Sequence, residues 1–376
     1  MEVPTTTTEL RDVLTAFRDN DMNGNGQNDE IPMLFANDGW ATNFKKLICG
    51  WFGCYWGQYT MDVENGQCYY PFVTDEYRQA LTYMRDLVND GLMSPLSFTM
   101  TSEQYRPLID VSENGLPVTI GVFLDHPYIT FSSASKTAAE DYVYLPTLSA
   151  ENGKTPYATY SASFTSFSTM ISGHTEHPEI CFRLLDWFCD EKTAISARYG
   201  EYGTHWCYFE EADLDLSKME FELSILDYLG YKPYWVCYEN PFVSQNNYVW
   251  RVTSIYMIPP ELFGSQISAQ GGDTGGVVNA GAQKYAEEFH KSVAERLAHL
   301  PDEMIAKLVL TEDEQNDIAE IKTSIDSYQL EALTGFVTGT MDLDSGWDNY
   351  IDTLNTIGLE QYINIVQTAW TRMTAN

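Results

Sequence analysis

The chain has 376 residues, of which 54 are acidic and 21 are Lys or Arg, so its formal net charge is −33. This charge argues against binding to nucleic acids or anionic membrane surfaces, since both are recognised through basic patches. Hydrophobic residues make up 44% of the chain, which is typical of a globular protein. The length predicts two or three domains, or one two-lobed body. No apolar run approaches the roughly 18 residues of a membrane-spanning helix.

Capping signals predict two helices in the N-terminal part of the chain. Thr6 and Glu9 have the spacing of a capping box, and apolar residues follow them at helical spacing. Thr74 begins a second predicted helix, which Gly91 ends. Between these helices, the aromatic and Gly-rich segment 47–72 is predicted to form short strands and loops.

The middle of the chain mixes predicted strands with a helix. Short apolar runs at 118–124 and 142–145 predict strands. Pro178 has the place of a first helical residue, and an apolar stripe predicts a helix from there to about Gly200. The stretch 264–282 is rich in Gly, Ser and Gln, and is the most linker-like part of the sequence.

The C-terminal part is predicted to be almost entirely helical. Thr311 and Glu314 form another capping box, and Ser345 is predicted to cap a helix that Gly358 ends. One more amphipathic helix is predicted from there to Met373. The sequence therefore predicts a mixed α/β fold that is rich in helices toward the C-terminus.

Motifs of the common enzyme classes are absent from the sequence. No G-x-S-x-G motif of a serine hydrolase occurs, and the glycine-rich segment 271–276 lacks the Lys of a P-loop. The seven cysteines contain no C-x-x-C pair, which favours free, buried thiols over a zinc or redox site. The 54 acidic residues offer so many carboxylate pairs that none of them indicates glycoside hydrolysis. We therefore predict a binding protein and not an enzyme.

One motif indicates a metal site. Residues 21–30 (DMNGNGQNDE) carry oxygen-bearing side chains at positions 1, 3, 5 and 9 and Gly at position 6, as an EF-hand calcium loop does. Position 12 is Pro32 where an EF-hand has Glu, so a bidentate carboxylate would have to come from Asp29 or Glu30. An acidic Asn-Gly turn without a cation explains the motif equally well.

Together with Pro4-Thr5-Thr6, Glu9-Leu10 and Ala16-Phe17 ahead of it, this loop resembles the family 1 bacterial extracellular solute-binding proteins of ABC transporters. It is most similar to the oligosaccharide-binding lipoproteins of Gram-positive bacteria and their alginate-binding relatives. Family-like motifs follow in the same order along nearly the whole chain. They are DMNGNGQNDEIP (21–32), TDEYRQALTYMRDLVNDGLMSP (74–95), DYVYLPTLSAENGK (141–154), EHPEICFRLLDWFCDEKTAISARYGEYGTHW (176–206) and FVTGTMDLDSGWDNYIDTLNTIGLEQYINIVQTAWTRM (336–373).

The resemblance implies a two-lobed periplasmic-binding-protein fold of type II, with the solute held between the lobes. The part that precedes Pro4 in the family is expected to be missing, namely the signal peptide, the lipidated cysteine and the first part of the N-terminal lobe. The expected domains are the first part of the C-terminal lobe with the calcium loop (1–135), the returning part of the N-terminal lobe with the crossing segments (136–260), and a helical C-terminal section that packs on the C-terminal lobe (261–376).

The resemblance also implies a function, which is to capture an oligosaccharide and deliver it to the permease subunits of an ABC transporter. A monomeric cell-surface lipoprotein of a Gram-positive bacterium is expected, with a lipid anchor on the missing N-terminus as its sole membrane contact. The net charge of −33 weighs against negatively charged uronates, so a neutral oligosaccharide is predicted. A secreted glycan-cleaving enzyme and a peptide-binding protein of related architecture are the alternatives.

Site residues follow from the resemblance and from the aromatic content. The calcium ligands carried over are Asp21, Asn23 and Asn25 by side chain, Gln27 by its backbone carbonyl, and Asp29 and Glu30 by carboxylate. The ion is expected to be structural, because no nucleophile or general base accompanies the loop.

Tryptophans in segments expected to be loops are the candidates for stacking against sugar rings, because an indole offers a flat apolar face and a polar edge. These candidates are Trp206, Trp235, Trp51 and Trp56. The tryptophans within predicted helices are assigned to packing, and they are Trp187, Trp347 and Trp370.

Overall fold

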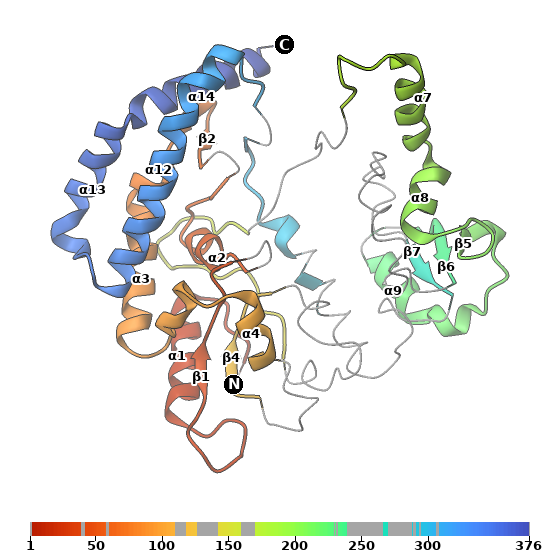
Figure 1. The fold of residues 1–376 in the computed structure, drawn as a ribbon. Coiled ribbons are helices and arrows are strands. Elements are labelled where there is room, and N and C mark those ends of the chain that lie inside the picture. The colour runs from red at the N-terminus through yellow and green to blue at the C-terminus, as the bar shows by residue number, and fades with distance from the viewer. Residues whose placement is uncertain are drawn as a thin grey trace. The chain divides into compact units, whose positions relative to one another are not determined.

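The computed structural model divides the chain into two compact units, Met1–Ser163 with Ser292–Asn376 and Phe164–Lys291 (Figure 1). The residues that it describes are 2–38, 42–57, 60–109, 118–125, 142–158, 170–228, 230, 232–238, 266–269, 288, 291–292, 295–305 and 308–375. Among the helices formed by these residues, none has the length and hydropathy needed to cross a membrane.

The first unit combines helices with two small sheets. Its helices are α1 (Thr7–Asp19), α2 (Phe44–Trp51), α3 (Asp75–Asn89), α4 (Ser102–Ile109), α12 (Glu312–Thr338), α13 (Leu343–Ile357) and α14 (Leu359–Thr374). Its strands are β1 (Ile31–Met33), β2 (Asp62–Glu64), β3 (Gln67–Tyr69) and β4 (Ile120–Val122).

The two predicted N-terminal helices are confirmed, and local hydrogen bonds explain where each begins. The Thr6 hydroxyl accepts from the Glu9 N–H and the Glu9 carboxylate accepts from the Thr6 N–H, which completes the capping box of α1. Thr74 caps α3 by accepting from Tyr77 N, and Gly91 follows the helix with φ +68°.

The prediction of strands and loops over 47–72 is wrong at its start, where α2 ends. Asn43 caps this helix by accepting from Lys46 N. Past its end, Gly53 has φ +82° and Cys54 N donates to the carbonyl of Cys49 at 3.0 Å, as in a Schellman motif. The apolar side chains of α2 are buried in the core, so tertiary packing stabilises a helix that aromatic and glycine content had obscured.

The same segment does contain the predicted short strands. Strands β2 and β3 pair antiparallel, and residues Asn65 and Gly66 between them have φ +51° and +74°. Positive φ at both turn residues is the geometry of a tight two-residue hairpin.

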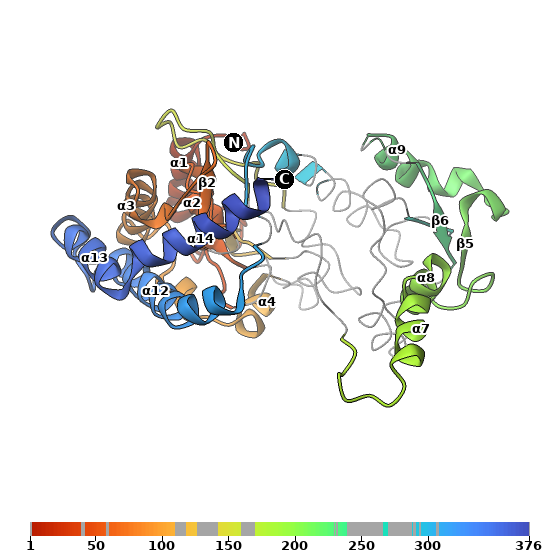
Figure 2. The ribbon, with the colours of Figure 1, turned by 90° about the horizontal axis from the view of Figure 1, so that it is seen from above.

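The C-terminal helices are confirmed, and α12, α13 and α14 lie alongside one another with α12 against α3 (Figures 1 and 2). The capping box of Thr311 and Glu314 is present at the start of α12. At α13 the capping residue is Asp342 and not Ser345, because the Asp342 carboxylate accepts from the Ser345 N–H. The predicted stop at Gly358 is confirmed, with φ +122°.

These helices share one hydrophobic core with α1, α2 and α3. The ring of Trp347 contacts the rings of both Tyr77 and Tyr350 in this core. The buried amide of Gln329 donates to the Tyr77 hydroxyl at 2.6 Å, so a satisfied polar contact also joins α12 to α3.

Strands β1 and β4 pair in parallel, with Ile31 opposite Ile120 and Met33 opposite Val122. The strand predicted within 118–124 is therefore confirmed. The strand predicted at 142–145 is wrong, because Tyr142 reaches β4 through its hydroxyl, which donates to the Ile120 carbonyl at 2.8 Å, and not through a backbone ladder.

The second unit holds a three-stranded sheet and helices. Its helices are α7 (Pro178–Phe188), α8 (Glu191–Tyr199) and α9 (Glu220–Tyr228), and its strands are β5 (Trp206–Tyr208), β6 (Trp235–Cys237) and β7 (Gln266–Ser268). Strand β6 lies between an antiparallel β5 and a parallel β7. The prediction of a linker over 264–282 is thus wrong at β7, because pairing with β6 forms a strand in a segment whose Gly, Ser and Gln content suggested none. Residues 264–265 and 270–282 lie outside the described residues.

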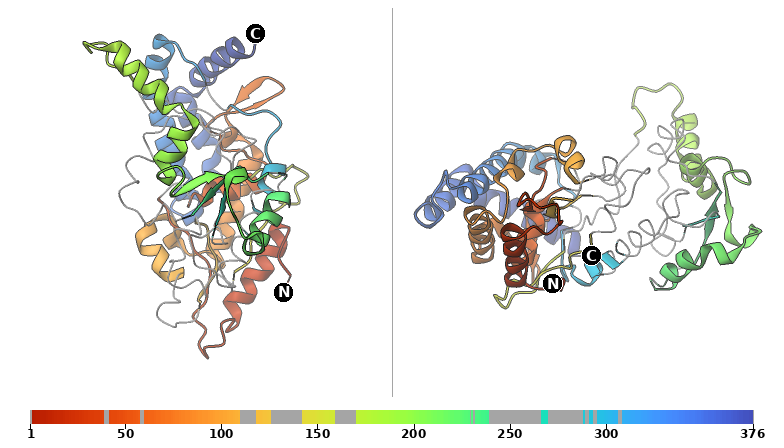
Figure 3. Two further views of the ribbon diagram at one scale, coloured as in Figure 1. Left: turned by 90° about the vertical axis from the view of Figure 1, so that its right-hand side faces the viewer. Right: turned by 90° about the horizontal axis from the view of Figure 1, so that it is seen from below.

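The helix predicted from Pro178 to Gly200 is interrupted. Asp190 accepts from Thr193 N and begins α8 as a separate helix. The apolar residues of α7 do not face a core, because Ile180 and Trp187 are 65% and 57% exposed. Helix α7 extends away from the sheet of its own unit (Figures 1 and 3), and the assignment of Trp187 to packing is wrong.

The cysteines are free thiols in the structure, as predicted. Five of them are buried, whereas Cys181 is half-buried and Cys189 is exposed. Both of the accessible thiols belong to or follow α7, the helix whose apolar residues are uncovered.

The position of Gly50 within α2 leaves no room for a side chain. A Cβ at this position would lie 2.2 Å from the backbone oxygen of Tyr157. Gly50→Ala should therefore lower the free energy of unfolding by about 1–3 kcal/mol, although Ala favours a helix. Thermal and urea unfolding followed by circular dichroism measure this loss.

The control is Gly173→Ala, because an added Cβ there meets no atom within 4 Å. This variant should unfold within about 0.5 kcal/mol of the parent chain. Equal stability of the two variants would contradict the close approach of Tyr157 to α2.

Candidate functional site

The acidic loop predicted to bind calcium lies between α1 and β1. Gly24 and Gly26 have φ +71° and +82°, so the chain turns sharply at the position where an EF-hand loop has its glycine. The Asn23 side chain donates to the Val118 carbonyl at 3.1 Å, which ties the loop to the residues that lead into β4.

The oxygen atoms of the loop converge on its own backbone N–H groups. The Asp21 carboxylate accepts from Asn25 N at 3.1 Å and from Gly26 N at 2.8 Å. The side-chain oxygens of Asn23 and Asn25 accept from N–H groups two residues on, and Asp29 accepts from the Asn25 amide. Side chains of the predicted ligand set therefore already face inward from a closed turn.

Glu30 carries the strongest indication of a missing partner. Its Oε1 accepts from the N–H groups of Met22 and Asn23 at 2.6 and 3.1 Å. Its Oε2 is buried, and no described residue bonds to it. Buried polar atoms almost always have a partner, and a cation satisfies an oxygen as well as a donor does.

Carboxylates alone do not make this site. Among the residues that the structure describes, no group of three or more His, Cys, Asp or Glu side chains is close enough to hold a metal ion together. A cation here would also need the amide oxygens of Asn23 and Asn25 and a backbone carbonyl, which hard cations accept as ligands. The predicted set, with Gln27 as the backbone donor, has this mixed composition.

The four candidate tryptophans occupy different environments. Trp51 ends α2, while Trp206 and Trp235 begin β5 and β6, so the loops expected for these three are not observed. Their side chains are fully or almost fully buried, and they leave no ring face for a sugar in this structure. Trp56 lies after α2 outside regular structure and is partly exposed, with its ring edge-on to Phe72.

Aromatic neighbours explain why two of these tryptophans are buried. Trp206 contacts Tyr202 and Tyr208, and Trp235 contacts Tyr199 and Tyr234, all within the second unit. Rings from the end of α8, from the segment before β5 and from the strands themselves cover one another here, and three of the four pairs are edge-on, which is a favourable geometry.

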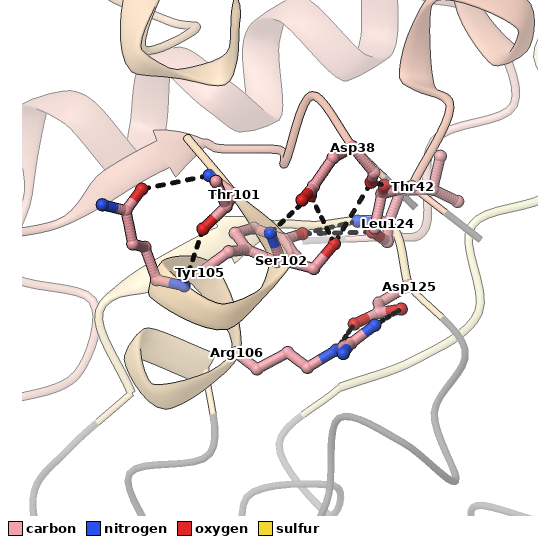
Figure 4. A network of polar contacts seen from close by, with 9 residues as sticks. Asp38, Thr42, Thr101, Ser102, Tyr105, Arg106, Leu124 and Asp125 are labelled. Carbon is pink, nitrogen blue, oxygen red and sulfur yellow. Dashed lines mark hydrogen bonds and ion pairs between the residues drawn. The ribbon is translucent and has the colours of Figure 1, made fainter. Parts of the chain in front are cut away.

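A second polar cluster lies near the carboxyl ends of β1 and β4 (Figure 4). The Asp38 carboxylate accepts from the Ser102 N–H at 2.5 Å and from the Ser102 hydroxyl at 2.7 Å. Thr42 donates through its hydroxyl to the backbone carbonyl of Asp38. These bonds attach the start of α4 to the segment that follows β1.

On the other side of the cluster, α4 is bonded to the end of β4. Arg106 donates to both carboxylate oxygens of Asp125, at 2.7 and 3.3 Å. The Tyr105 hydroxyl donates to the Leu124 carbonyl and accepts from the Leu124 N–H. The Asp125 side chain is fully buried, whereas that of Arg106 is 29% exposed.

Hydrogen bonds shift the pKa of one acid and of one base in this cluster. The Ser102 hydroxyl and then its N–H lower the pKa of Asp38, and the charge of Arg106 adds to this effect. Asp125 raises the pKa of Arg106, so the guanidinium stays charged. The sequence pattern did not identify this cluster, although acids directly after two apolar strand-like runs are its signal.

No family model matches the chain. The fructooligosaccharide ABC transporter substrate-binding protein FusA of Streptococcus pneumoniae is 22% identical, over 100% of this chain and 64% of FusA. The lipoprotein LipO of Bacillus subtilis is 25% identical, over 55% of this chain and 41% of LipO. The chain thus spans less than two thirds of the length of these relatives.

Solved structures share the fold of the chain. An extracellular solute-binding protein from Bifidobacterium longum subsp. infantis has a TM-score of 0.70 at 21% identity, over 100% of this chain and 71% of that one. FusA, described as an EF-hand mutant in complex with fructo-nystose, has a TM-score of 0.68 at 18% identity, over 100% of this chain and 70% of that one.

The resemblance predicted from the sequence is confirmed by these comparisons. Among the relatives and structural neighbours of the chain are ABC-transporter solute-binding proteins described as binding oligosaccharides. The predicted fold class, a two-lobed α/β solute-binding-protein fold, is confirmed as well.

Ser102→Ala is predicted to raise the pKa of Asp38 toward its ordinary value without reaching it, because the backbone N–H of Ser102 still donates. A lowered folded-state pKa stabilises the fold above the unfolded pKa, and this contribution is lost as the pH falls through the folded pKa. The variant should therefore lose less stability on acidification than the parent chain does.

Carboxyl NMR titration of Asp38 measures this shift directly. Ser94→Ala is the control, because its hydroxyl accepts from Leu96 N and does not contact Asp38. An unchanged Asp38 titration in Ser102→Ala would show that the hydroxyl bond is not formed.

Proposed function

We propose that the protein captures an oligosaccharide outside the cell and presents it to an ABC permease, without chemical change. The observation that carries this proposal is the match to a fructooligosaccharide-binding transport protein along the whole of this chain. The shared fold supports it. Relatives that are binding proteins also make an enzyme the weaker alternative.

We assign the parts of the chain to two lobes on the same grounds. The expected boundaries, 1–135, 136–260 and 261–376, differ from the observed division, because β7 at 266–268 pairs with β6 in the second unit. We therefore assign Met1–Ser163 with Ser292–Asn376 to the C-terminal lobe and Phe164–Lys291 to the returning part of the N-terminal lobe. The core shared by α12, α13 and α14 with α1 to α3 supports the first assignment. The separate sheet and aromatic cluster around β6 support the second.

The calcium ion would be held by the loop between α1 and β1. Asp21, Asn23, Asn25, Asp29 and Glu30 would supply side-chain oxygens, and Gln27 its backbone carbonyl. The buried, unpartnered Oε2 of Glu30 supports this assignment within the chain, and the EF-hand mutant of FusA supports it among relatives. The ion would neutralise the loop's carboxylates and fix the entry into β1.

The ligand would be a neutral oligosaccharide, with Trp56 offering its ring to a sugar. Trp56 is partly exposed, and Lys46 Nζ lies 5.8 Å from the centre of its ring. We assign Trp51, Trp206 and Trp235 to packing because they are buried. The lipoprotein LipO among the relatives supports a lipid anchor that would hold the protein at the surface of a Gram-positive cell. The protein would act there as a monomer.

Calcium removal is predicted to destabilise the protein. An ion that binds only the folded state adds about 2.7 kcal/mol at a hundredfold excess over Kd. Chelation should therefore lower the Tm by roughly 3–5 °C in a chain of this size. Differential scanning calorimetry with and without EDTA, together with elemental analysis, measures the effect.

Asp21→Ala should reproduce this loss and leave glycan specificity unchanged. Asn28→Ala is the matched control, because Asn28 belongs to the loop but is not among the six ligands. A melting curve that does not respond to EDTA, with no divalent ion bound, would favour the simple Asn-Gly turn.

Neutral oligosaccharides are predicted to bind the chain. The substitution Trp56→Leu is predicted to weaken this binding. Loss of one aromatic contact costs about 0.5–1.5 kcal/mol, or roughly 2- to 13-fold in Kd. Trp370→Leu in α14 serves as control and should bind with unchanged affinity. Isothermal titration with kestose, other neutral tri- and tetrasaccharides, trigalacturonate and oligopeptides gives the affinities.

Each alternative has its own outcome in the same experiment. Shortened glycans recovered from the calorimeter cell after the titration would identify a glycan-cleaving enzyme. Heat with oligopeptides alone would identify a peptide-binding protein. Tight binding of trigalacturonate, with neutral sugars inert, would contradict the neutral ligand.

A further inference from the structure

The polar cluster of Asp38, Ser102, Arg106 and Asp125 has the place in the fold where α/β proteins bind their ligands. Asp38 follows β1 and Asp125 follows β4, and these strands are parallel. In parallel sheets the carboxyl ends of the strands lie at one edge, and ligands bind in the crevice outside it. Helix α4 covers this edge and contributes Ser102 and Arg106 (Figure 4).

Arg106 is held in a fixed orientation and retains hydrogen-bonding capacity. Its Nε and Nη2 donate to the buried carboxylate of Asp125. A bidentate pair fixes the guanidinium plane and leaves the other edge to donate elsewhere. Within the described residues no bond involves Nη1, and 29% of the Arg106 side chain is exposed. This geometry is that of a pre-organised donor.

Asp38 complements Arg106 as an acceptor. Its Oδ1 is fully engaged by Ser102, while no hydrogen bond of Oδ2 occurs among the described residues. The residue is exposed, and the bonds to Ser102 keep it ionised. A carboxylate oxygen held in this way accepts strongly from hydroxyl groups.

The local charge of the cluster is negative despite its cation. Asp38, Asp125 and Glu103 all act on Arg106, and Lys45 bonds to the side chain of neighbouring Asn37. Among the described residues named here, three carboxylates and two cations leave a net charge of −1. Donors and acceptors for hydroxyl groups are therefore present, while the charge of Arg106 is already offset by Asp125 and is not left for a uronate.

We propose that Asp38 and Arg106 form a subsite for one unit of a neutral oligosaccharide. Asp38 accepts hydrogen bonds from sugar hydroxyls, and the free edge of Arg106 donates to hydroxyl oxygens. Asp125 orients Arg106 and offsets its charge, which makes it a positioning residue. This inference rests on the proposed function and adds to it the residues that select neutral sugars.

Two conservative variants of the full chain test the subsite by isothermal titration with the same neutral saccharides and trigalacturonate. Asp38→Asn removes the charged acceptor, and Arg106→Lys keeps a positive charge beside Asp125 but removes the second donor edge. Each variant should weaken the binding of neutral saccharides, with Kd raised about tenfold or more. Asp125→Asn should in addition improve the relative affinity for trigalacturonate, because it frees the charge of Arg106.

The matched controls are Asp344→Asn and Arg85→Lys, a pair of the same residue types in α13 and α3. These should bind like the parent chain. Circular dichroism and Tm measurements separate weakened binding from misfolding. Since Arg106→Lys preserves the ion pair, it decides the question if Asp38→Asn fails to fold.

The outcomes distinguish this inference from the proposed function. If the parent chain binds neutral saccharides and both variants bind them equally well, the subsite is wrong and the proposed function stands. If the parent chain binds no oligosaccharide, or trigalacturonate alone, the proposed function in its neutral form and the subsite are both overturned.

Discussion

The parallel pairing of β1 with β4 is the constraint on which both candidate sites depend. Ile31 N donates to the Thr119 carbonyl at 2.8 Å and Leu34 N to the Val122 carbonyl at 3.1 Å. The acidic loop ends where β1 begins, and the cluster around Asp38 lies beyond its other end. At roughly 3.3 Å per residue, these few residues hold the two sites a short, fixed distance apart. The Asn23 side chain also ties the loop to Val118, just ahead of β4, so both strands of the pair are attached to the loop.

Local signals were sufficient for part of the fold and insufficient for the rest. Helices with capping residues, such as Thr6 and Thr311, were predicted correctly because the cap and the first turn are adjacent in sequence. Three-residue strands such as β7 give no periodic pattern, and their existence depends on a partner elsewhere. The break at Asp190 was missed because the apolar spacing continues across it.

The same distinction separates the two sites. The acidic loop is contiguous, so its donors and its glycine turn at Gly26 could be predicted from the sequence. The second cluster unites Asp38, Ser102 and Asp125, and its members are brought together by tertiary structure alone. Burial of a tryptophan also depends on tertiary neighbours, which explains why composition pointed to Trp206 when its ring lies in a core.

Selection between neutral and acidic glycans depends on the charges close to the ligand and not on the net charge of the chain. Charges are screened over about 8 Å at physiological ionic strength, so most of the net charge of −33 acts weakly at any one site. In the proposed subsite, a buried aspartate already offsets the charge of the arginine, and Asp38 is held ionised by its hydrogen bonds. In a chain with the same fold, replacing one such carboxylate by a lysine would reverse the sign of this local charge. Ligand charge can therefore change within this fold while the overall composition and the acidic loop remain as they are.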